Sequence, residues 1–425
     1  MKLILGILLF IYNLSFAQEL KIVTPESYLK ENPSLEREAV VDLIIKQFEG
    51  RSVSQAELDD LWNNQETREA LNLARFQVIN QKLYAEGTGH EEIGAYFRAY
   101  IQFFQRLVQK YKIPDVDFII HTADQLQVES KDENKFLKKL NKIPSFMFAI
   151  DLKDEYESER LLILDPLMLL SKHRKVLSQI KETNKQTSWE SKIDKLYWRG
   201  SSTGSASLQY KLENISKLPR LVLTFMSKLY PDKIDAKFTY LREDAFAEDE
   251  KGRLEKIIDI LGMSESDKVK EIDHLKYKYL ASIDGNTATG TRIPWIMLSN
   301  SVLVKQDSNK IEWFYPAMKP YVHYVPIKED LTDIFAQIEW MRANDEQVKQ
   351  ISENAQNFVS NSLMPQDLEA HMVIILNEYS KIQQDKKIVA KVRSAEETRS
   401  FISISIGVIK RIKKNFVEWI NSLWQ

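Results

Sequence analysis

Two short stretches of this 425-residue chain each place an arginine among glycines and hydroxyl side chains. KLYWRGSSTGSAS surrounds Arg199, and YLASIDGNTATGTRIPW surrounds Arg292. An arginine keeps its charge and offers a planar set of donors that suits phosphate. Glycine, serine and threonine neighbours let backbone N–H groups and hydroxyls approach the same anion closely. The pattern therefore indicates a phosphate site, with two ordinary loops carrying salt-bridged arginines as the alternative.

The second stretch leads directly into residues 291–300, which are predicted to be helical. The N-terminus of a helix favours an anion, because its first N–H groups have no partner within the helix. Neither arginine stretch has the spacing of a P-loop or of a dinucleotide-binding fingerprint. The expected phosphate site thus depends on the residue types and on this position before a helix.

Short apolar runs bounded by turn formers predict the strands that position these loops. In the first half they are residues 114–126, 143–151 and 160–166. In the second half they are residues 220–230, 235–241, 276–285, 299–307 and 322–327. Strands separated by helical segments predict an α/β architecture with parallel sheets.

Helical periodicity predicts the remaining elements. Residues 18–110 are expected to be mostly helical, in segments 34–50, 54–87 and 93–112. Further helices are expected at residues 252–262, 291–300, 330–345, 345–363 and 366–384. Asp330 is the expected N-cap of the helix over 330–345, with Asp333 at its N3 position.

The bulk composition is ordinary for a globular protein. Hydrophobic residues make up 44% and charged residues 28% of the chain, and the net charge is -2. Because this charge gives no global basic field, we expect no nucleic-acid partner. The absence of cysteine excludes disulfides, thiolate nucleophiles and cysteine-bound metals. At about 150 residues per domain, the length indicates two or three domains.

A third stretch, IEWFYPAMKPYVHYVPIKEDL, follows the two arginine stretches. In order and spacing the three resemble the CAP10-like glycosyltransferases of family 90, which include capsule- and lipopolysaccharide-modifying proteins and protein O-glucosyltransferases. The resemblance covers about Pro114 to Asn357. It implies a GT-B fold, in which two Rossmann-like lobes face a cleft. It also implies inverting transfer of a sugar from a nucleotide sugar, typically a UDP-sugar, without a cofactor or an obligatory metal.

The resemblance implies roles for individual residues. The donor site is expected to comprise Arg199, Gly200, Ser201, Thr287, Ala288, Thr289, Gly290, Thr291 and Arg292. Asp124, at the end of the strand DFIIHTADQL, is the implied catalytic base. It would take the proton of an acceptor hydroxyl on a glycan, a lipid-linked saccharide or a protein. The arginines and a helix N-terminus would stabilise the leaving diphosphate in place of a metal.

The chain departs from the family pattern at two positions and in its cysteine content. Ser202 stands where many relatives carry arginine, and Ile293 where they often carry an aromatic residue. Both changes bear on the identity of the donor sugar. Because the luminal relatives are rich in cysteine, its absence places the chain nearer to the bacterial branch. A non-catalytic sugar-binding or scaffolding relative is the alternative function.

Other acidic and imidazole groups form weaker patterns. The sequence DVD at residues 115–117 resembles a metal-binding Asp-x-Asp motif, but it precedes its strand, so we interpret it as a solvated turn. The six histidines show no metal-ligand spacing, so no metal site is expected. His121 is expected in the core or at the mouth of the cleft, and His323 in a structural position or at the donor site. Glu312 is a candidate contact for ribose hydroxyls.

Both ends of the chain suggest export or membrane contact. Residues 1–17 fit a short secretory signal, with an uncleaved anchor as the alternative. The basic tail, 386–425, contains an apolar helical face over 401–425, which fits a helix on an anionic membrane or one packed against protein. Residues 18–190 are the expected acceptor-side lobe with a helical start, and residues 191–385 the nucleotide-sugar-binding lobe. The protein is expected to be exported or membrane-associated, with the cytoplasmic face of a membrane as the alternative.

Overall fold

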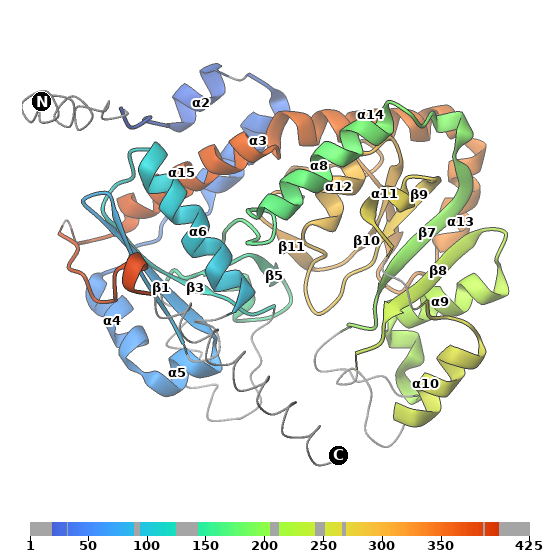
Figure 1. The fold of residues 1–425 in the computed structure, drawn as a ribbon, viewed down its shortest axis with the longest axis horizontal. Coiled ribbons are helices and arrows are strands. Elements are labelled where there is room, and N and C mark those ends of the chain that lie inside the picture. Colours follow the sequence, from blue (N-terminus) through green and yellow to red (C-terminus); the bar gives the residue numbers. More distant parts are fainter. Residues whose placement is uncertain are drawn as a thin grey trace, which may run out of the picture.

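The computed structural model describes residues 19–31, 33–88, 94–124, 143–204, 212–242, 251–265, 269–385 and 387–398. Within them the chain forms two five-stranded sheets that are packed with helices, as well as a two-stranded sheet (Figure 1). The predicted α/β architecture is confirmed. The expected signal at 1–17 and the expected helix over 401–425 lie outside the described residues.

The first sheet is mixed rather than parallel. Its spatial order is β2 (Lys82–Gly87), β1 (Leu73–Ile79), β3 (Val116–His121), β4 (Phe146–Met147) and β6 (Leu161–Leu162). β2, β1 and β3 pair antiparallel, whereas β3, β4 and β6 run parallel. The helix α6 (Ala95–Lys110) buries Phe97, Tyr100 and Phe104 against Phe76 of β1, and this aromatic cluster is the centre of the first core.

The hairpin β1–β2 corrects the prediction of helix throughout residues 54–87. Helix is present only in α4 (Gln55–Asn63) and α5 (Gln65–Ala70). The chain then reverses at Asn80 and Gln81, whose φ values of 50° and 62° are those of a two-residue hairpin turn. Because β1 is buried on both faces, it lacks the apolar–polar alternation that marks a half-buried strand.

The second sheet is entirely parallel. Its spatial order is β12 (Val325–Lys328), β10 (Val302–Asp307), β9 (Tyr277–Ser282), β7 (Ile193–Ser201) and β8 (Ile234–Tyr240). The chain passes from β7 outward to β8 and then returns to β9 on the other side of β7. The loops after β7 and β9 are therefore neighbours at a topological switch point, where open α/β sheets bind ligands. These loops are the two arginine stretches.

The helices of the second sheet follow the predictions with two corrections. They are α9 (Pro219–Leu229), α10 (Lys251–Ile260), α11 (Glu271–His274), α12 (Arg292–Leu298) and α13 (Ile334–Ala343). Residues 220–230 were predicted as a strand but form α9, since Pro219 suits a first helical turn and the buried Leu221 and Thr224 lie three residues apart. The N-cap of α13 is Asp333 and not Asp330, whose carboxylate accepts from the Thr332 N–H at 3.0 Å.

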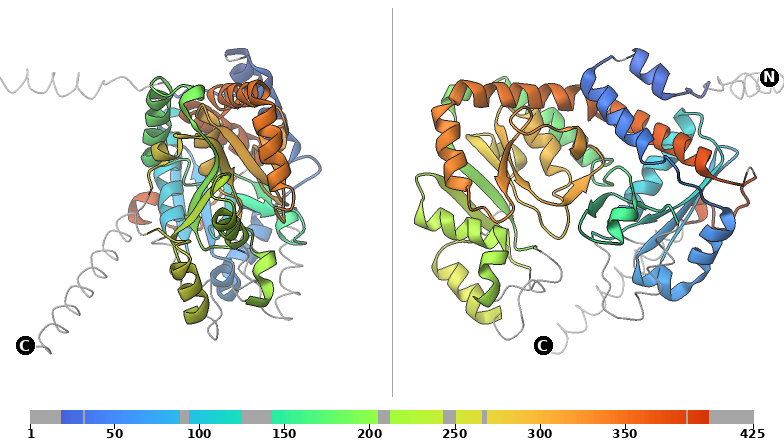
Figure 2. Two further views of the ribbon diagram at one scale, coloured as in Figure 1. Left: turned by 90° about the vertical axis from the view of Figure 1, so that its right-hand side faces the viewer. Right: turned by 180° about the vertical axis from the view of Figure 1, so that it is seen from behind.

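Several segments join the two sheets. β5 (Ala149–Asp151) pairs antiparallel with β11 (Lys310–Glu312), so loops of the two sheets meet directly. α14 (Asp345–Ser362) and α15 (Pro365–Ile382) run along the top of Figure 1 toward the first sheet, and Figure 2 shows the same crossing from behind. There α15 packs on α3 (Leu35–Lys46) and β3. Two further α-helices are α2 (Pro25–Glu31) and α8 (Ser171–Asn184).

The start of the basic tail is attached to the first sheet. The Arg393 carbonyl accepts from the Ala85 N–H at 2.9 Å, and the Lys391 N–H donates to Gln77 Oε1 at 2.8 Å. Residues 387–398 therefore belong to the folded body, whereas residues 399–425 lie outside the described residues. In the described part of the chain, no helix has the length and apolar composition needed to cross a membrane.

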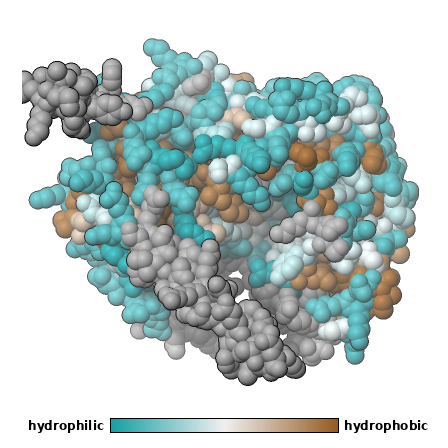
Figure 3. Space-filling view, viewed as in Figure 1, coloured by the Kyte–Doolittle hydropathy of each residue, from teal (hydrophilic) through white to brown (hydrophobic). Residues whose placement is uncertain are grey.

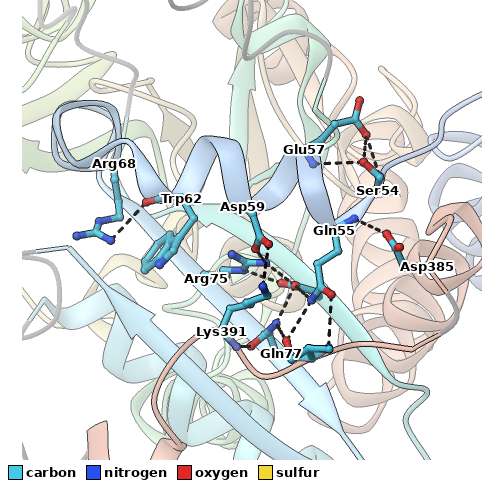
Figure 4. Close-up of polar contacts among 12 residues, drawn as sticks. Ser54, Gln55, Glu57, Asp59, Trp62, Arg68, Arg75, Gln77, Asp385 and Lys391 are labelled. Carbon is cyan, nitrogen blue, oxygen red and sulfur yellow. Dashed lines mark hydrogen bonds and ion pairs between the residues drawn. The ribbon is translucent and has the colours of Figure 1, made fainter.

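A buried ion pair lies beneath this attached segment (Figure 4). Arg75 of β1 donates from Nε and Nη2 to the Asp117 carboxylate at 2.9 and 2.6 Å, and both side chains are fully buried. Gln55 and Gln77 donate to the same carboxylate at 2.9 and 2.7 Å and also to the Val389 carbonyl. Asp117 is thus an interior residue of β3, and the interpretation of residues 115–117 as a solvated turn is wrong for it.

The face seen in Figure 1 is mostly hydrophilic, and its apolar side chains form scattered groups, one of them at the lower right (Figure 3). Leu229 at the end of α9 and Ile260 at the end of α10 are among the most exposed apolar residues of the described part, at 73% and 82%. The polar surface elsewhere agrees with a protein whose apolar residues are used in its cores.

Candidate functional site

A pocket of about 520 Å³ opens at the carboxyl ends of the parallel strands. It is lined by Gly204, Ser216, Lys217, Pro219, Asp284, Gly285, Gln306, Ser308, Lys310, Lys328, Glu329 and Asp330. Most of these residues lie at or after the carboxyl ends of β7, β9, β10 and β12, so four of the five strands of the sheet lead to it. The position is the one at which an open α/β sheet binds its ligand.

Arg220, at the start of α9, lies beside this pocket. It donates to the carbonyls of Ile283 and Ser201 at 2.9 and 3.0 Å and to the Thr203 hydroxyl. A Cβ atom at Gly285, which lines the pocket, would lie 2.8 Å from both Arg220 Nη2 and Thr203 Oγ1. The guanidinium therefore reaches the pocket lining only because residue 285 has no side chain. Sequence inspection missed Arg220, which no motif marks.

Arg292 is partly buried, and its charge interacts with that of Arg220. Its Nη2 donates to the Arg199 carbonyl at 2.7 Å, while its buried Nη1 has no hydrogen-bond partner among the described residues. Burial, and then the charge of Arg220, lower the pKa of Arg292 to about 10. No carboxylate in the described part forms an ion pair with Arg292. A partly buried cation with a buried, unused donor, near a second cation, is an environment that favours an anion.

Arg199 is differently placed. Its guanidinium forms ion pairs with Asp235 and Glu265, both at 2.8 Å, and stacks over the ring of Tyr197 at 4.4 Å. The side chain is only 8% exposed. The structure thus brings Arg199 and Arg292 together, but through the backbone of Arg199, whose own charge is already balanced. The donor-binding role of the Arg199 side chain stays a prediction that this geometry does not favour.

The neighbours of Arg199 have structural reasons for their small size. A Cβ at Gly200 would lie 2.5 Å from the Trp198 ring, so only glycine fits there. Ser201 Oγ lies 3.2 Å from Thr203 Oγ1. Ser202 Oγ is buried and accepts from the Arg242 N–H at 2.8 Å. These contacts place the Ser201–Thr203 hydroxyls at the carboxyl end of β7, beside Arg220.

The loop before Arg292, residues 287–291, is held by a contact with β9 and by a contact with the first sheet. Thr287 and Ala288 are 8% exposed, and Thr289 Oγ1 lies 2.6 Å from Ser282 Oγ. Thr291 is the N-cap of α12, but its side chain makes no cap hydrogen bond and the helix has only seven residues. The N-terminus of α12 should therefore contribute less to anion binding than the sequence suggested, and the cationic side chains are the stronger feature.

Gly290 marks the contact of this loop with the first sheet. Its φ is +55°, a conformation that favours glycine, and a Cβ there would lie 2.5 Å from Asp165 Oδ2. Asp165 follows β6 and is fixed by the Leu167 N–H, which donates to Oδ1 at 2.6 Å. The carboxyl of a residue from the first sheet therefore supports the Gly290 backbone. Asp165 was not identified from the sequence, because the run RLLILDP shows a strand end and nothing more.

Asp124 lies on the same side as Asp165. It is partly buried after the end of β3, and its Oδ1 accepts from the Tyr96 hydroxyl at 2.8 Å. Burial raises the pKa of Asp165 to about 7, and the charge of Asp124 contributes to the increase. The two carboxyls are thus close enough to interact, and Asp165 contacts the loop before Arg292. The catalytic role of Asp124 stays a prediction.

Glu312 is in the interior of the interface between the sheets. It is fully buried on β11, and its Oε1 accepts from the Tyr315 hydroxyl at 3.2 Å. Burial, and next the charge of Asp165, raise its pKa well above the usual value. A contact with ribose stays a prediction, but this burial favours a role for Glu312 in joining the two sheets.

The histidines singled out from the sequence occupy core positions. His121 is buried, with Nε2 at 2.9 Å from Ser145 Oγ, and burial lowers its pKa to about 3. His323 Nδ1 accepts from the Lys319 N–H at 3.0 Å within a tight turn. Both of these positions are structural. In the part of the chain that the structure describes, no three His, Asp or Glu side chains are arranged to hold a metal ion.

The Asp165 carboxyl predicts a measurable pH dependence of stability. Its pKa of about 7 in the folded protein lies above its usual value of 3.8, so folding is favoured by the protonated form. This stabilisation is complete below about pH 4 and is lost as the pH rises through about 7. Each unit of pKa difference corresponds to about 1.4 kcal/mol. Denaturant unfolding should therefore show wild type losing stability relative to Asp165→Asn between pH 4 and 8.

The Asp165→Asn variant is the control that separates Asp165 from the titratable groups around it. Those groups are Asp124, Glu312 and Tyr100. Because Asn keeps the shape but cannot ionise, Asp165→Asn should flatten the curve without a loss at pH 5. Parallel curves for the two proteins would show that Asp165 does not carry the dependence.

A comparison with known proteins decides the family. The family model for "Glycosyl transferase family 90" matches residues 51–420. The chain belongs to this family of glycosyltransferases. The resemblance inferred from the three sequence stretches is thereby confirmed.

Several proteins of known type are similar to this family 90 chain. It is 27% identical over 322 residues to protein O-glucosyltransferase 3 of Mus musculus, covering 75% of the chain and 57% of that protein. It is 26% identical over 328 residues to protein O-glucosyltransferase 2 of Danio rerio, covering 77% and 58%. It is 31% identical over 196 residues to protein O-glucosyltransferase 1 of Rattus norvegicus, covering 46% and 44%. The chain thus spans less than three-fifths of the length of these relatives.

Among solved structures, a glycosyltransferase from Rickettsia africae ESF-5 aligns with a TM-score of 0.37 and 12% identity. The alignment covers 65% of the chain and 74% of that structure.

Proposed function

We propose that this family 90 chain transfers a sugar from a nucleotide sugar, most simply a UDP-sugar, to a hydroxyl group of a protein, with inversion and without a metal or cofactor. Similarity to protein O-glucosyltransferases supports a protein acceptor over a glycan or a lipid-linked saccharide. The observation that carries the proposal is the partly buried Arg292, whose buried Nη1 is unpartnered among the described residues and whose charge interacts with that of Arg220 at the carboxyl end of a parallel sheet.

The proposed chemistry is a single displacement. The acceptor oxygen forms a bond to the anomeric carbon while the bond from that carbon to the diphosphate oxygen breaks, and the acceptor proton passes to Asp124. Negative charge then develops on the diphosphate, where Arg292, Arg220 and the Thr203 hydroxyl stabilise it. Asp165 holds the loop at Gly290, so that the donor loop faces the first sheet. In this proposal the two sheets belong to the lobes of a GT-B fold, with domain boundaries near residues 190 and 385.

UDP binding measured by calorimetry tests the phosphate site. Arg292→Ala should weaken it about 10- to 100-fold, because one or two charge-assisted hydrogen bonds are lost. Arg342→Ala is a matched control, since Arg342 is a surface arginine that pairs with Asp194 and Glu339. Turnover of UDP-glucose should persist in EDTA. The proposal is wrong if wild type neither binds UDP nor turns over a UDP-sugar, and its metal-free part is wrong if EDTA stops turnover.

The residue types of segments 1–17 and 401–425 motivate a proposal for the cellular location. We propose an exported or membrane-associated enzyme, with a signal at residues 1–17 and a peripheral membrane contact through residues 401–425. A sugar nucleotide must then be supplied on the same side of the membrane as the enzyme.

A further inference from the structure

The proposed transfer reaction does not use one part of the third sequence stretch, KPYVHYVPI. Its first residues form a tight turn between η6 (Tyr315–Ala317) and β12. The Lys319 N–H donates to His323 Nδ1 at 3.0 Å, and the Tyr321 N–H donates to the Tyr324 carbonyl at 2.8 Å. These two hydrogen bonds fix the backbone on both sides of Tyr321, so the position of its ring is set by a rigid turn.

Tyr321 has a backbone conformation that a tyrosine rarely adopts. Its φ is +57°, in the left-handed region where a side chain costs free energy and glycine does not. Leu331 has a similar φ of +61°, but its side chain is fully buried in the second core, so packing accounts for it. The Tyr321 side chain is 42% exposed, so packing accounts for it only in part. Strain of this kind at an exposed ring is a reason to look for a function.

The Tyr321 ring lines a shallow pocket of about 510 Å³ on the surface of α13. The other lining residues are Ala336, Gln337, Trp340 and Gln347. The Tyr321 and Trp340 rings meet edge to face, with centroids 5.2 Å apart and planes at 75°. Gln337 Nε2 donates to the Tyr321 hydroxyl at 2.9 Å, which fixes the orientation of that hydroxyl.

The chemistry of this pocket selects one class of ligand. None of the five lining residues carries a charge, so an ionic ligand would gain no pairing there. A purely apolar ligand would cover the carboxamides of Gln337 and Gln347 without satisfying their hydrogen bonds. A saccharide satisfies both kinds of group, because its C–H faces pack on aromatic rings and its hydroxyls pair with carboxamides and with a tyrosine hydroxyl.

We propose that the Tyr321–Trp340 pocket binds a neutral saccharide unit, as a site separate from the pocket at the carboxyl ends of the strands. Figures 1 and 2 place α13 at the outer edge of the second sheet, on the side away from the first sheet. A glycan held there stays attached to the protein while the proposed transfer reaction takes place elsewhere. The inference does not depend on the proposed function, because it rests on the turn and on the α13 surface alone.

Native affinity electrophoresis of the full chain in gels containing soluble neutral polysaccharides tests the proposal. Laminarin, galactomannan, glucomannan and hydroxyethyl cellulose are suitable probes, with the anionic polygalacturonate as the comparison. We expect at least one neutral polysaccharide to retard wild type and polygalacturonate to have less effect. Tyr321→Gly should raise the apparent dissociation constant at least tenfold, and Gln337→Leu should raise it by a smaller factor.

The glycine variant distinguishes ligand binding from a structural role. Glycine relieves the backbone strain at φ +57°, so Tyr321→Gly should leave the melting temperature unchanged or raise it. Tyr230→Ala is the matched control. Tyr230 is 45% exposed, and its ring packs on Phe335 of α13 at a centroid distance of 4.5 Å. UDP binding should be unaffected in both variants.

Three outcomes overturn the proposal. The first is the absence of retardation by every neutral probe, and the second is equal retardation of wild type and Tyr321→Gly. The third is a marked fall in melting temperature in Tyr321→Gly, which would show that the ring serves packing. If wild type fails to bind UDP but is retarded, the proposed transfer function fails while this site stands.

Discussion

Asp124→Asn is expected to lower kcat about 10²- to 10⁴-fold while UDP binding changes by less than about twofold. The carboxylate follows β3, where it accepts a hydrogen bond from the Tyr96 hydroxyl at 2.8 Å, and the isosteric amide still fits that position. The amide cannot take a proton from the acceptor hydroxyl. Initial rates at saturating UDP-sugar and acceptor peptide, together with UDP calorimetry, separate the loss of a base from the loss of donor binding.

Two carboxylates provide the controls for Asp124. Asp115 is an exposed residue near the start of the same strand, and its Oδ1 accepts from the Asn80 N–H at 2.8 Å. Asp115→Asn should leave kcat unchanged. Asp165→Asn should affect the pH dependence of stability more than kcat, because Asp165 is 2% exposed and supports Gly290. If Asp165→Asn abolishes turnover and Asp124→Asn does not, the base has been assigned to the wrong carboxyl.

Most of the parallel sheet could be predicted from the sequence. Four of its strands are short apolar runs bounded by turn residues, and they occur where they were expected. The errors lie where an apolar run fits two periodicities. Residues 221–226 suit a buried strand as well as a helix, and only their packing as α9 decides between the two. The β1–β2 hairpin was missed because Asn80 and Gln81 adopt positive φ without a glycine.

The candidate site could be predicted only in part, because its electrostatics depend on contacts between distant segments. Arg292 has an unpartnered donor among the described residues, whereas Arg199 is neutralised by Asp235 and Glu265, which are 36 and 66 residues further along the chain. Both arginines have similar neighbours in sequence, so the difference in their ion pairing depends on contacts that only the fold creates. Arg220 and Asp165 have no motif, and each approaches a loop of the candidate site where a glycine leaves room for it.

The second large expected effect concerns the Arg75–Asp117 ion pair beneath residues 387–398. Arg75→Met should lower the free energy of unfolding by about 3–5 kcal/mol, because it leaves the Asp117 carboxylate buried with only the neutral donors Gln55 and Gln77. Denaturant unfolding at neutral pH measures this loss. Glu182→Gln is the surface control. Its ion pair with Lys185 is about two-thirds exposed, so the expected change is within about 0.5 kcal/mol.

A double substitution shows whether the buried charge is the cause. Arg75→Met with Asp117→Leu removes both charges, so it should recover a large part of the stability that Arg75→Met loses. Gln55 and Gln77 also donate to the Val389 carbonyl, so the single variant should increase hydrogen exchange over residues 387–398 before it affects the second sheet. Equal losses in the single and double variants would mean that packing volume, or the contact of Arg75 with Asp59 at 2.7 Å, stabilises this region, and that the unpaired Asp117 carboxylate is not the cause. The attachment of the C-terminal segment would then be independent of the ion pair.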